Sequence, residues 1–349
     1  MPPIARRHYV LVMEFTGVDP TNDEHFDAWF GVLQRSEVLR DQGQGRGWHP
    51  SEWRARTLDE TAPAYHQLFS YGDDLLKPVA VGSLEVTRTD NLHWIRGDLF
   101  VDPTQRRRGY GSLILEHLED TARAIGRPTM LLWVIEGSDE RGSGPSRNFA
   151  PQHGYDIVEE NIRRDLVWPR PVGELARLQA TWSPFAVGYD VLSWRGPTPE
   201  SLVDARAHLS AVMPVEVPDA GFGLEEESWN AQRVRHHEKE TNEMGRDLLV
   251  AVARHGESGE HAGFSELSVS REQPDTAYQW DTLVVGAHRG HRLGGLMKIA
   301  TMRLLAEGEY ATTKISTFNS EINAPMIAVN DALGARVSGG IVTWRKSLM

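Results

Sequence analysis

Eight residues of the first half, QRRRGYGS at positions 105–112, combine three arginines and two glycines directly before a helix-like segment. The first turn of a helix leaves backbone N–H groups without partners, and the helix dipole gives that end partial positive charge. Glycines let a phosphate approach the backbone, and arginines add charge-assisted hydrogen bonds. The stretch therefore predicts an anion site of the phosphate-binding type. It has neither the GK[ST] of a Walker loop nor a GxGxxG dinucleotide fingerprint.

Strand-like and helix-like segments flank this stretch. The run IRGDLFV at 95–101 indicates a strand that leads into it. The segment after it has apolar residues at helical spacing, namely Ile114, Leu118, Ala122 and Ile125. Gly126 predicts the end of that helix.

The same order of elements recurs in the second half. At an offset of 183 residues, Asp98 falls on Asp281, Arg106 on Arg289, and Gly111 on Gly294. A repeat of this length indicates a duplicated domain and is far too long for a solenoid unit.

The chain has 349 residues, which favours two domains over one core. We predict an N-terminal domain over 1–168, a linker over 169–184 that carries prolines at its start, and a C-terminal domain over 185–349. Each domain is expected to be α/β (α+β), with a mixed, mostly antiparallel twisted sheet flanked by helices.

Composition narrows the function classes. There is no cysteine, which excludes disulfides and thiolate metal sites and fits a cytoplasmic protein. A net charge of −12 argues against nucleic acid or an anionic membrane as partner and favours a cation such as an amine. No apolar run is long enough to span a bilayer. We expect a monomer or homodimer without a metal site.

The charge run RVRHHEKE at 233–240 predicts a solvated helix face. His236 and His237 within it are adjacent, which is not the spacing of a helical zinc pair.

The pattern Arg106-x-x-Gly109-x-Gly111 resembles the (Q/R)xxGx(G/A) pyrophosphate loop of GNAT-superfamily acyltransferases, which bind acetyl-coenzyme A (acetyl-CoA). Residues 101–106, VDPTQR, match the usual lead-in to that loop. The resemblance extends over nearly the whole chain and is similar to tandem GNAT proteins of actinobacteria, such as mycothiol synthase. Over the range from Asp281 to Gly334, the second copy resembles one subgroup of the GNAT superfamily more specifically.

The resemblance implies which residues bind the cofactor. In the family, a backbone N–H from the strand before the loop holds the developing oxyanion, where a bulge splays the sheet. The residues implied are Leu99, Phe100, Val101, Arg106, Arg107, Arg108, Gly109, Tyr110, Gly111 and Ser112 in the first copy, and Leu283, Val284, Val285, Arg289, His291, Arg292, Leu293, Gly294, Asn319 and Asn323 in the second. Asn323 has an alternative role, as the cap of the helix that begins near Pro325.

Acidic residues are the candidates for proton transfer. Many GNAT domains have an acid at the position of Asp98, which binds or deprotonates the acceptor amine. Asp281 has the same interpretation in the second copy, and Glu85 and Glu266 are secondary candidates that would act through water. The alternative for each is a structural salt bridge.

Each copy departs from the family pattern. Arg292 stands where the second loop should have its first glycine, so it either crowds a pyrophosphate or binds it through its guanidinium. The tyrosine that often protonates the leaving thiolate is replaced by Ala150 in the first copy and Asn330 in the second, which leaves Tyr110 or water for that role. We predict that the first copy binds acetyl-CoA more normally.

The predicted function is acetyl-CoA-dependent N-acetylation of a small, cationic primary amine by direct attack. Two alternatives stay open: a mycothiol-synthase-like acetylation of a cysteinyl amino-sugar conjugate, and a coenzyme A sensor that has lost its chemistry.

Overall fold

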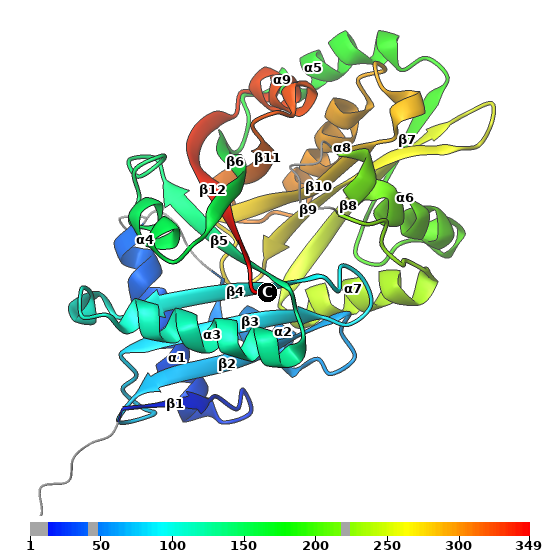
Figure 1. The fold of residues 1–349 in the computed structure, drawn as a ribbon. Helices are drawn as coiled ribbons and strands as arrows, with labels where there is room; N and C mark the ends of the chain where they lie inside the picture. The colour runs from blue at the N-terminus through cyan, green and yellow to red at the C-terminus, as the bar shows by residue number, and fades with distance from the viewer. Residues whose placement is uncertain (1–12, 41–47, 218–223) are drawn as a thin grey trace, which may run out of the picture.

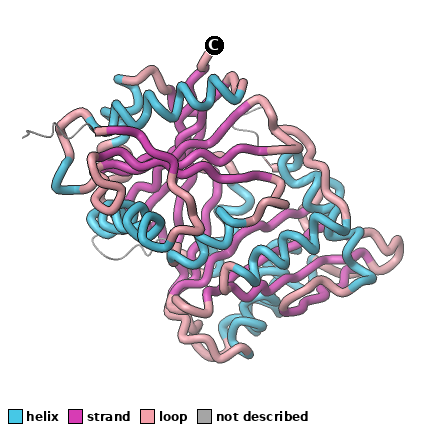
Figure 2. Tube along the Cα trace, turned by 90° about the horizontal axis from the view of Figure 1, so that it is seen from below, coloured by secondary structure: helices cyan, strands magenta, loops and turns pink. Residues whose placement is uncertain are grey.

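The computed structural model of the protein describes residues 13–40, 48–217 and 224–349. Its strands form one mixed, twelve-stranded sheet that continues through both halves, with helices on its faces (Figures 1 and 2). The predicted α/β class is confirmed, and the sheets of the two halves join into one. No helix of the described ranges is long and apolar enough to cross a membrane.

The elements follow one plan twice. Those of the first half are β1 (Glu14–Gly17), α1 (Asp23–Arg40), α2 (Pro50–Leu58), β2 (Ala64–Gly72), β3 (Ala80–Thr87), β4 (Trp94–Val101), η1 (Pro103–Gln105), α3 (Tyr110–Ile125), β5 (Thr129–Gly137), α4 (Ser146–Gln152) and β6 (Asp156–Val167). After α5 (Glu174–Trp182) and η2 (Ser183–Phe185), those of the second half are β7 (Tyr189–Arg195), η3 (Glu200–Leu202), α6 (Val203–Glu216), α7 (Ala231–Glu243), β8 (Arg246–His255), β9 (His261–Ser270), β10 (Thr276–Val284), η4 (Gly286–His288), α8 (Leu293–Glu307), β11 (Lys314–Ser320), α9 (Ala324–Leu333) and β12 (Arg336–Ser347).

The last strand of each half is exchanged with the other half. The sheet order is β1-β2-β3-β4-β5-β12-β6-β11-β10-β9-β8-β7. The C-terminal strand β12 therefore lies between β5 and β6, and β6 pairs antiparallel with β11. The division at 168 and 185 stays a prediction, and neither half would keep this sheet without the strand that the other supplies.

One apolar face of α3 covers the first half of the sheet. Ile114, Leu118 and Ala122 are fully buried there, and Ile125 packs against the same cluster. The predicted helical spacing is confirmed. The helix ends at Gly126, whose φ of 86° lies in the left-handed region that glycine adopts without strain.

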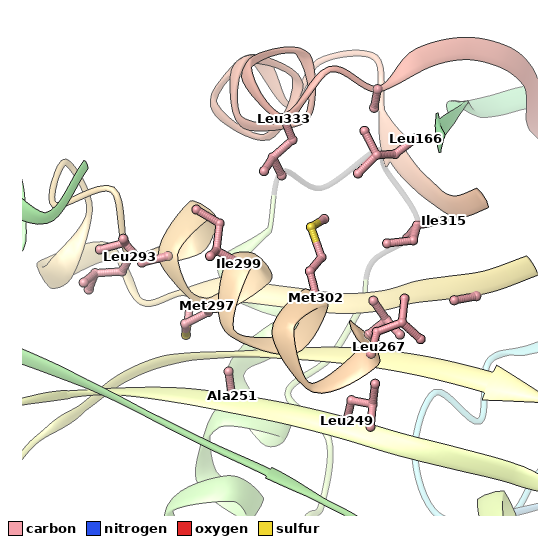
Figure 3. Close-up of a cluster of buried hydrophobic side chains, with 14 of the residues drawn as sticks. Leu166, Leu249, Ala251, Leu267, Leu293, Met297, Ile299, Met302, Ile315 and Leu333 are labelled. Atoms are coloured by element: carbon pink, nitrogen blue, oxygen red, sulfur yellow. The ribbon is translucent and has the colours of Figure 1, made fainter. Parts of the chain in front are cut away.

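The corresponding helix α8 is buried more completely. Met297 and Met302 belong to one cluster with Leu249 of β8 and Leu333 of α9 (Figure 3). Leu166 of the exchanged strand β6 joins the same cluster, so the second core includes a first-half strand.

Charged side chains join α2 of the first half to the second half. Arg246 Nη2 lies 3.0 Å from Glu52 Oε2, with both side chains almost fully buried. On α7, His236 Nε2 lies 2.8 Å from Asp59 Oδ2, and Glu240 Oε1 lies 3.8 Å from Arg56 Nε. The prediction of a solvated face for 233–240 is wrong, because α7 packs part of its polar side against α2.

Candidate active site

The first arginine-rich loop is open to solvent. It connects β4 to α3, and Arg106, Arg107 and Arg108 are exposed. Gly109 stands before the first helical residue with a φ of 87°, and no heavy atom lies within 4 Å of the position that a Cβ would take there. A helix N-terminus, an unobstructed glycine and three arginines together fit a pyrophosphate.

Each loop lies beside a place where two parallel strands part. The pairing of β4 with β5 ends at Gly97 and Leu132, although β4 continues to Val101. The pairing of β10 with β11 ends in the same way at Gln279 and Thr317. Each half therefore has a gap in the sheet that begins next to its loop.

Backbone direction decides which amides face each gap. Asp102 donates its N–H to Val79 O and Val285 donates its N–H to Ala262 O, both toward the strand on the far side from the gap. Because successive residues of a strand turn their amides to opposite sides, the N–H groups of Val101 and Val284 face the gaps. The same alternation directs the N–H of Leu99 toward the gap.

The alternation turns the remaining predicted amides away, since those of Phe100, Leu283 and Val285 point to the neighbouring strand. A register shift between Gln279 and Thr282 gives β10 the expected bulge. No such shift interrupts the paired residues of β3 and β4, so the prediction of a bulge in the first copy is wrong.

The second loop is charge-neutralised by its own chain. Arg289 Nη2 lies 2.8 Å from Glu216 Oε2 at the end of α6, and the N–H of Gly286 donates to the same oxygen at 3.0 Å. Arg292 occupies the position of Gly109 with a φ of 58°, and its guanidinium stacks over Phe185 at 5.4 Å. A phosphate here would compete with the Glu216 carboxylate.

The asparagines of the second copy hold other side chains. Asn323 caps α9 by accepting the N–H of Met326 at 3.2 Å, which is the alternative role that the sequence allowed. Buried Asn319 accepts from Asn330 Nδ2 at 3.0 Å, and Asn330 accepts from Lys298 Nζ at 2.7 Å. Burial lowers the pKa of Lys298 to about 7.

Three predicted residues of the first loop contact side chains of other elements in the first half. Tyr110 lies with its ring 5.9 Å from that of Tyr71, and Ser112 Oγ lies 2.8 Å from His153 Nε2. A Cβ at Gly111 would lie 3.3 Å from Phe149, so close packing as well as cofactor access favours glycine there.

In the first half, the candidate acids are held by arginines. Arg96 binds Glu85, and its Nε lies 3.8 Å from Asp98 Oδ2. Arg56 adds a contact of 3.4 Å to Glu85. Burial alone would raise the pKa of Glu85, but the two guanidinium groups lower it to about 2. A carboxylate held this firmly in its charged form is a weak proton acceptor.

In the second half, Asp281 lies at the bulge of β10, where part of its surface is exposed to solvent and its carboxylate lies near Glu266. Reduced hydration of its carboxylate and the negative charge of Glu266 raise its pKa to about 6. A carboxyl group that titrates this close to neutrality can both accept and release a proton at physiological pH. Identical residues at equivalent positions thus have different environments.

An open pocket of about 580 Å³ lies between α6 and the segment that leads into α7. Its lining residues are Asp204, Ala207, His208, Ala211, Glu226, Glu227, Ser228, Trp229, Asn230 and Ala231. Arg233 binds Glu227 and lies over the Trp229 ring at 4.6 Å, which leaves Asp204 and Glu226 as the lining carboxylates that attract a cation. The Trp229 ring lies 6.1 Å from that of His237, which in turn approaches Glu266.

A parted strand pair beside a loop and the start of a helix is present twice in the one sheet. Residues 34–155 match the model of the acetyltransferase (GNAT) family. This match lies within the first half of the chain, and the likeness of the second half rests on the fold that it shares with solved structures. No curated protein matches the sequence of the chain.

Solved structures share this fold over nearly the whole chain. A tandem GNAT protein from the clavulanic acid biosynthesis pathway is 24% identical, with a TM-score of 0.76, and the match covers 97% of this chain and 99% of that one. A GCN5-related N-acetyltransferase from Sphaerobacter thermophilus is 14% identical, with a TM-score of 0.64 and 96% of each chain covered. The N-myristoyltransferase of Saccharomyces cerevisiae is 12% identical, with a TM-score of 0.57, over 99% of this chain and 81% of that one.

Proposed function

We propose that the protein is an acetyl-CoA-dependent N-acetyltransferase that acts on the primary amine of a small, cationic acceptor. The observation that carries the proposal is the pairing, in the second half, of a gap between parallel strands with a solvent-accessible carboxyl group that titrates near neutrality. The acidic pocket beside α6 supports a cationic acceptor. The open first loop supports a pyrophosphate-containing cofactor.

The two halves divide the work in this proposal. The first half holds acetyl-CoA tightly at its open loop, but its acids are engaged by Arg96 and Arg56 and do not take part in chemistry. The second half binds the cofactor more weakly, because Glu216 occupies Arg289, and carries out the transfer. The sequence left open that the whole protein binds coenzyme A without carrying out chemistry. In this proposal, only the first half does so.

Acetyl-CoA supplies a thioester whose acetyl carbon is attacked by the neutral amine, with coenzyme A leaving as thiolate and the proton that the nitrogen loses passing to the thiolate or to water. The Asp281 carboxylate takes the proton of the acceptor's ammonium group, directly or through water. The gap-facing N–H of Val284 stabilises the negative charge that develops on the acetyl oxygen. No side chain forms a covalent bond with the acetyl group.

The first loop should dominate cofactor affinity. A leucine at Gly109 would fill the approach to the helix start, so we expect Gly109→Leu to weaken the tight site at least tenfold, or about 1.4 kcal/mol. Turnover at saturating cofactor should change little, since the chemistry is in the other half. Isothermal titration calorimetry and initial rates measure the two effects.

Gly126→Leu is the matched control, because Gly126 also has positive φ and open space at its Cβ position but lies at the other end of α3. Equal loss of affinity in both variants would attribute the effect to backbone strain and contradict the assignment of the loop.

Binding stoichiometry should show one tight and one weak site in each chain. Removing the charge that competes with phosphate, by Glu216→Gln, should tighten the weak site several-fold and leave the tight one unchanged. Glu307→Gln is the control, because it removes one exposed negative charge at the far end of α8. Two equal sites in the unmodified protein would refute the role given to Glu216 and Arg289.

A further inference from the structure

His237 of α7 is packed into a charged cluster that the sequence did not predict. Its Nε2 lies 3.5 Å from Glu266 Oε2. Glu266 is only 2% exposed, and its other carboxylate oxygen binds Arg206 of α6. The rings of Trp229 and Trp280 lie 6.1 Å and 6.0 Å from the imidazole and restrict its position.

The strand register brings this cluster to Asp281. Leu267 pairs with Gln279, and Ser265 pairs with Thr282, so Glu266 stands opposite the bulge that contains Asp281. Hydrogen bonds fix both sides of the bulge: Gln279 Nε2 donates to Ser265 Oγ at 3.1 Å, and Ser265 Oγ lies 2.8 Å from Thr282 Oγ1.

We propose that His237 is a positioning residue for the acid–base chemistry of the second half: it holds Glu266 in place opposite Asp281 and supplies the positive charge that keeps Asp281 able to accept the acceptor's proton. This inference rests on the proposed function. It assigns a catalytic contribution to a helix whose charged residues otherwise join the two halves.

The charged groups around Asp281 support the direction in which His237 shifts the pKa of Asp281. Glu266 of β9 and Glu227 of the segment before α7 raise its pKa, whereas Arg206 of α6 and His237 of α7 lower it. Burial lowers the pKa of His237, but Glu266 more than offsets this, so the net shift is upward. Loss of the imidazolium would therefore raise the pKa of Asp281 and leave it protonated over a wider pH range.

Among the described residues of the first half, this arrangement has no counterpart. Ser83, not an acid, pairs with Asp98 across β3 and β4. His66 is the histidine near Glu85, and burial together with the Arg56 charge lowers its pKa to about 3, so it is neutral at physiological pH. The described residues thus place a histidine of raised pKa beside a strand acid in the second half, where the proposal locates the chemistry.

The pH dependence of kcat/KM tests the inference. In His237→Gln, we expect the acid limb of the profile to move up by about half a unit to one unit, below the 1–3 units that a close opposite charge can produce. His236→Gln is the matched control, since it removes the neighbouring imidazole, which pairs with Asp59 of the first half. The control should keep the profile of the unmodified protein. An unshifted profile in His237→Gln, or an equal shift in both variants, would overturn the role of His237.

Nuclear magnetic resonance titration of the histidines gives a readout without substrate. The His237 signal is identified by its loss in His237→Gln, and it should titrate at lower pH in Asp281→Asn, because one of the charges that favour the imidazolium is gone. An unchanged titration would overturn the coupling even in an active enzyme. A shifted titration in a protein that acetylates no amine would instead refute the proposed function and support the cluster.

Discussion

Asp281→Asn should lower kcat/KM by about 10²-fold, the usual range for loss of a general base, or about 2.7 kcal/mol of transition-state stabilisation. The amide keeps the size of the side chain but cannot take a proton from the acceptor's ammonium group. Cofactor affinity should stay near that of the unmodified protein, because Asp281 belongs to β10 and not to a loop, and the melting temperature should not fall, because the amide removes a negative charge near Glu266.

The pH dependence gives this prediction a second test. The pKa of Asp281 is raised to about 6, so the unmodified enzyme should gain activity as pH rises through that region and the carboxylate forms. The deficit of Asp281→Asn should shrink at high pH, where the free amine becomes abundant. Rates measured from acid to alkaline pH check both trends.

Asp98→Asn is the internal control, since it makes the same change at the equivalent position of the first half. We expect near-normal turnover, because Arg96 Nε already lies 3.8 Å from the Asp98 carboxylate. Loss of turnover in Asp98→Asn with normal turnover in Asp281→Asn would transfer the chemistry to the first half.

Arg246→Met should lower the free energy of unfolding by about 3–5 kcal/mol, the usual effect of breaking a buried ion pair from one side. The guanidinium is the partner of Glu52, whose side chain is 1% exposed, and the pair joins α2 to the first residue of β8. Methionine keeps much of the apolar stem but leaves the Glu52 carboxylate without its counter-charge.

Arg254→Met controls for the loss of an arginine from the same strand. Its pair with Asp190 is exposed on both sides and should contribute less than about 1 kcal/mol. Urea unfolding at neutral pH compares the two variants. Equal, small effects would show that the Arg246–Glu52 pair does not stabilise the arrangement of the halves.

Local patterns in the sequence were sufficient to predict the loop and the helix after it. The helix ends at Gly126 as predicted, and the apolar face of α3 follows from the spacing of its residues. The equivalence of Asp98 and Asp281 also holds, since both lie in the strand before a loop. These features depend on neighbours along the chain, which a sequence displays directly.

What the sequence could not predict depends on partners that are distant in the chain. The insertion of β12 between β5 and β6 follows from pairing across about half of the sequence. The charged residues of α7 were predicted to be solvated because their partners Arg56, Asp59 and Glu266 lie in other segments. The different fates of Asp98 and Asp281 follow from the strand register, which sets Arg96 beside one and Glu266 opposite the other.

Release of free coenzyme A in the presence of amines tests the central claim most directly. Because the chain has no cysteine, a thiol reagent added to the reaction detects only the thiol that leaves acetyl-CoA. We expect release to depend on a small cationic amine, to match the acetylated amine found by mass spectrometry, and to fall about 10²-fold in Asp281→Asn. Tight binding of acetyl-CoA without amine-dependent release across a panel of cationic amines would contradict the assignment as an N-acetyltransferase.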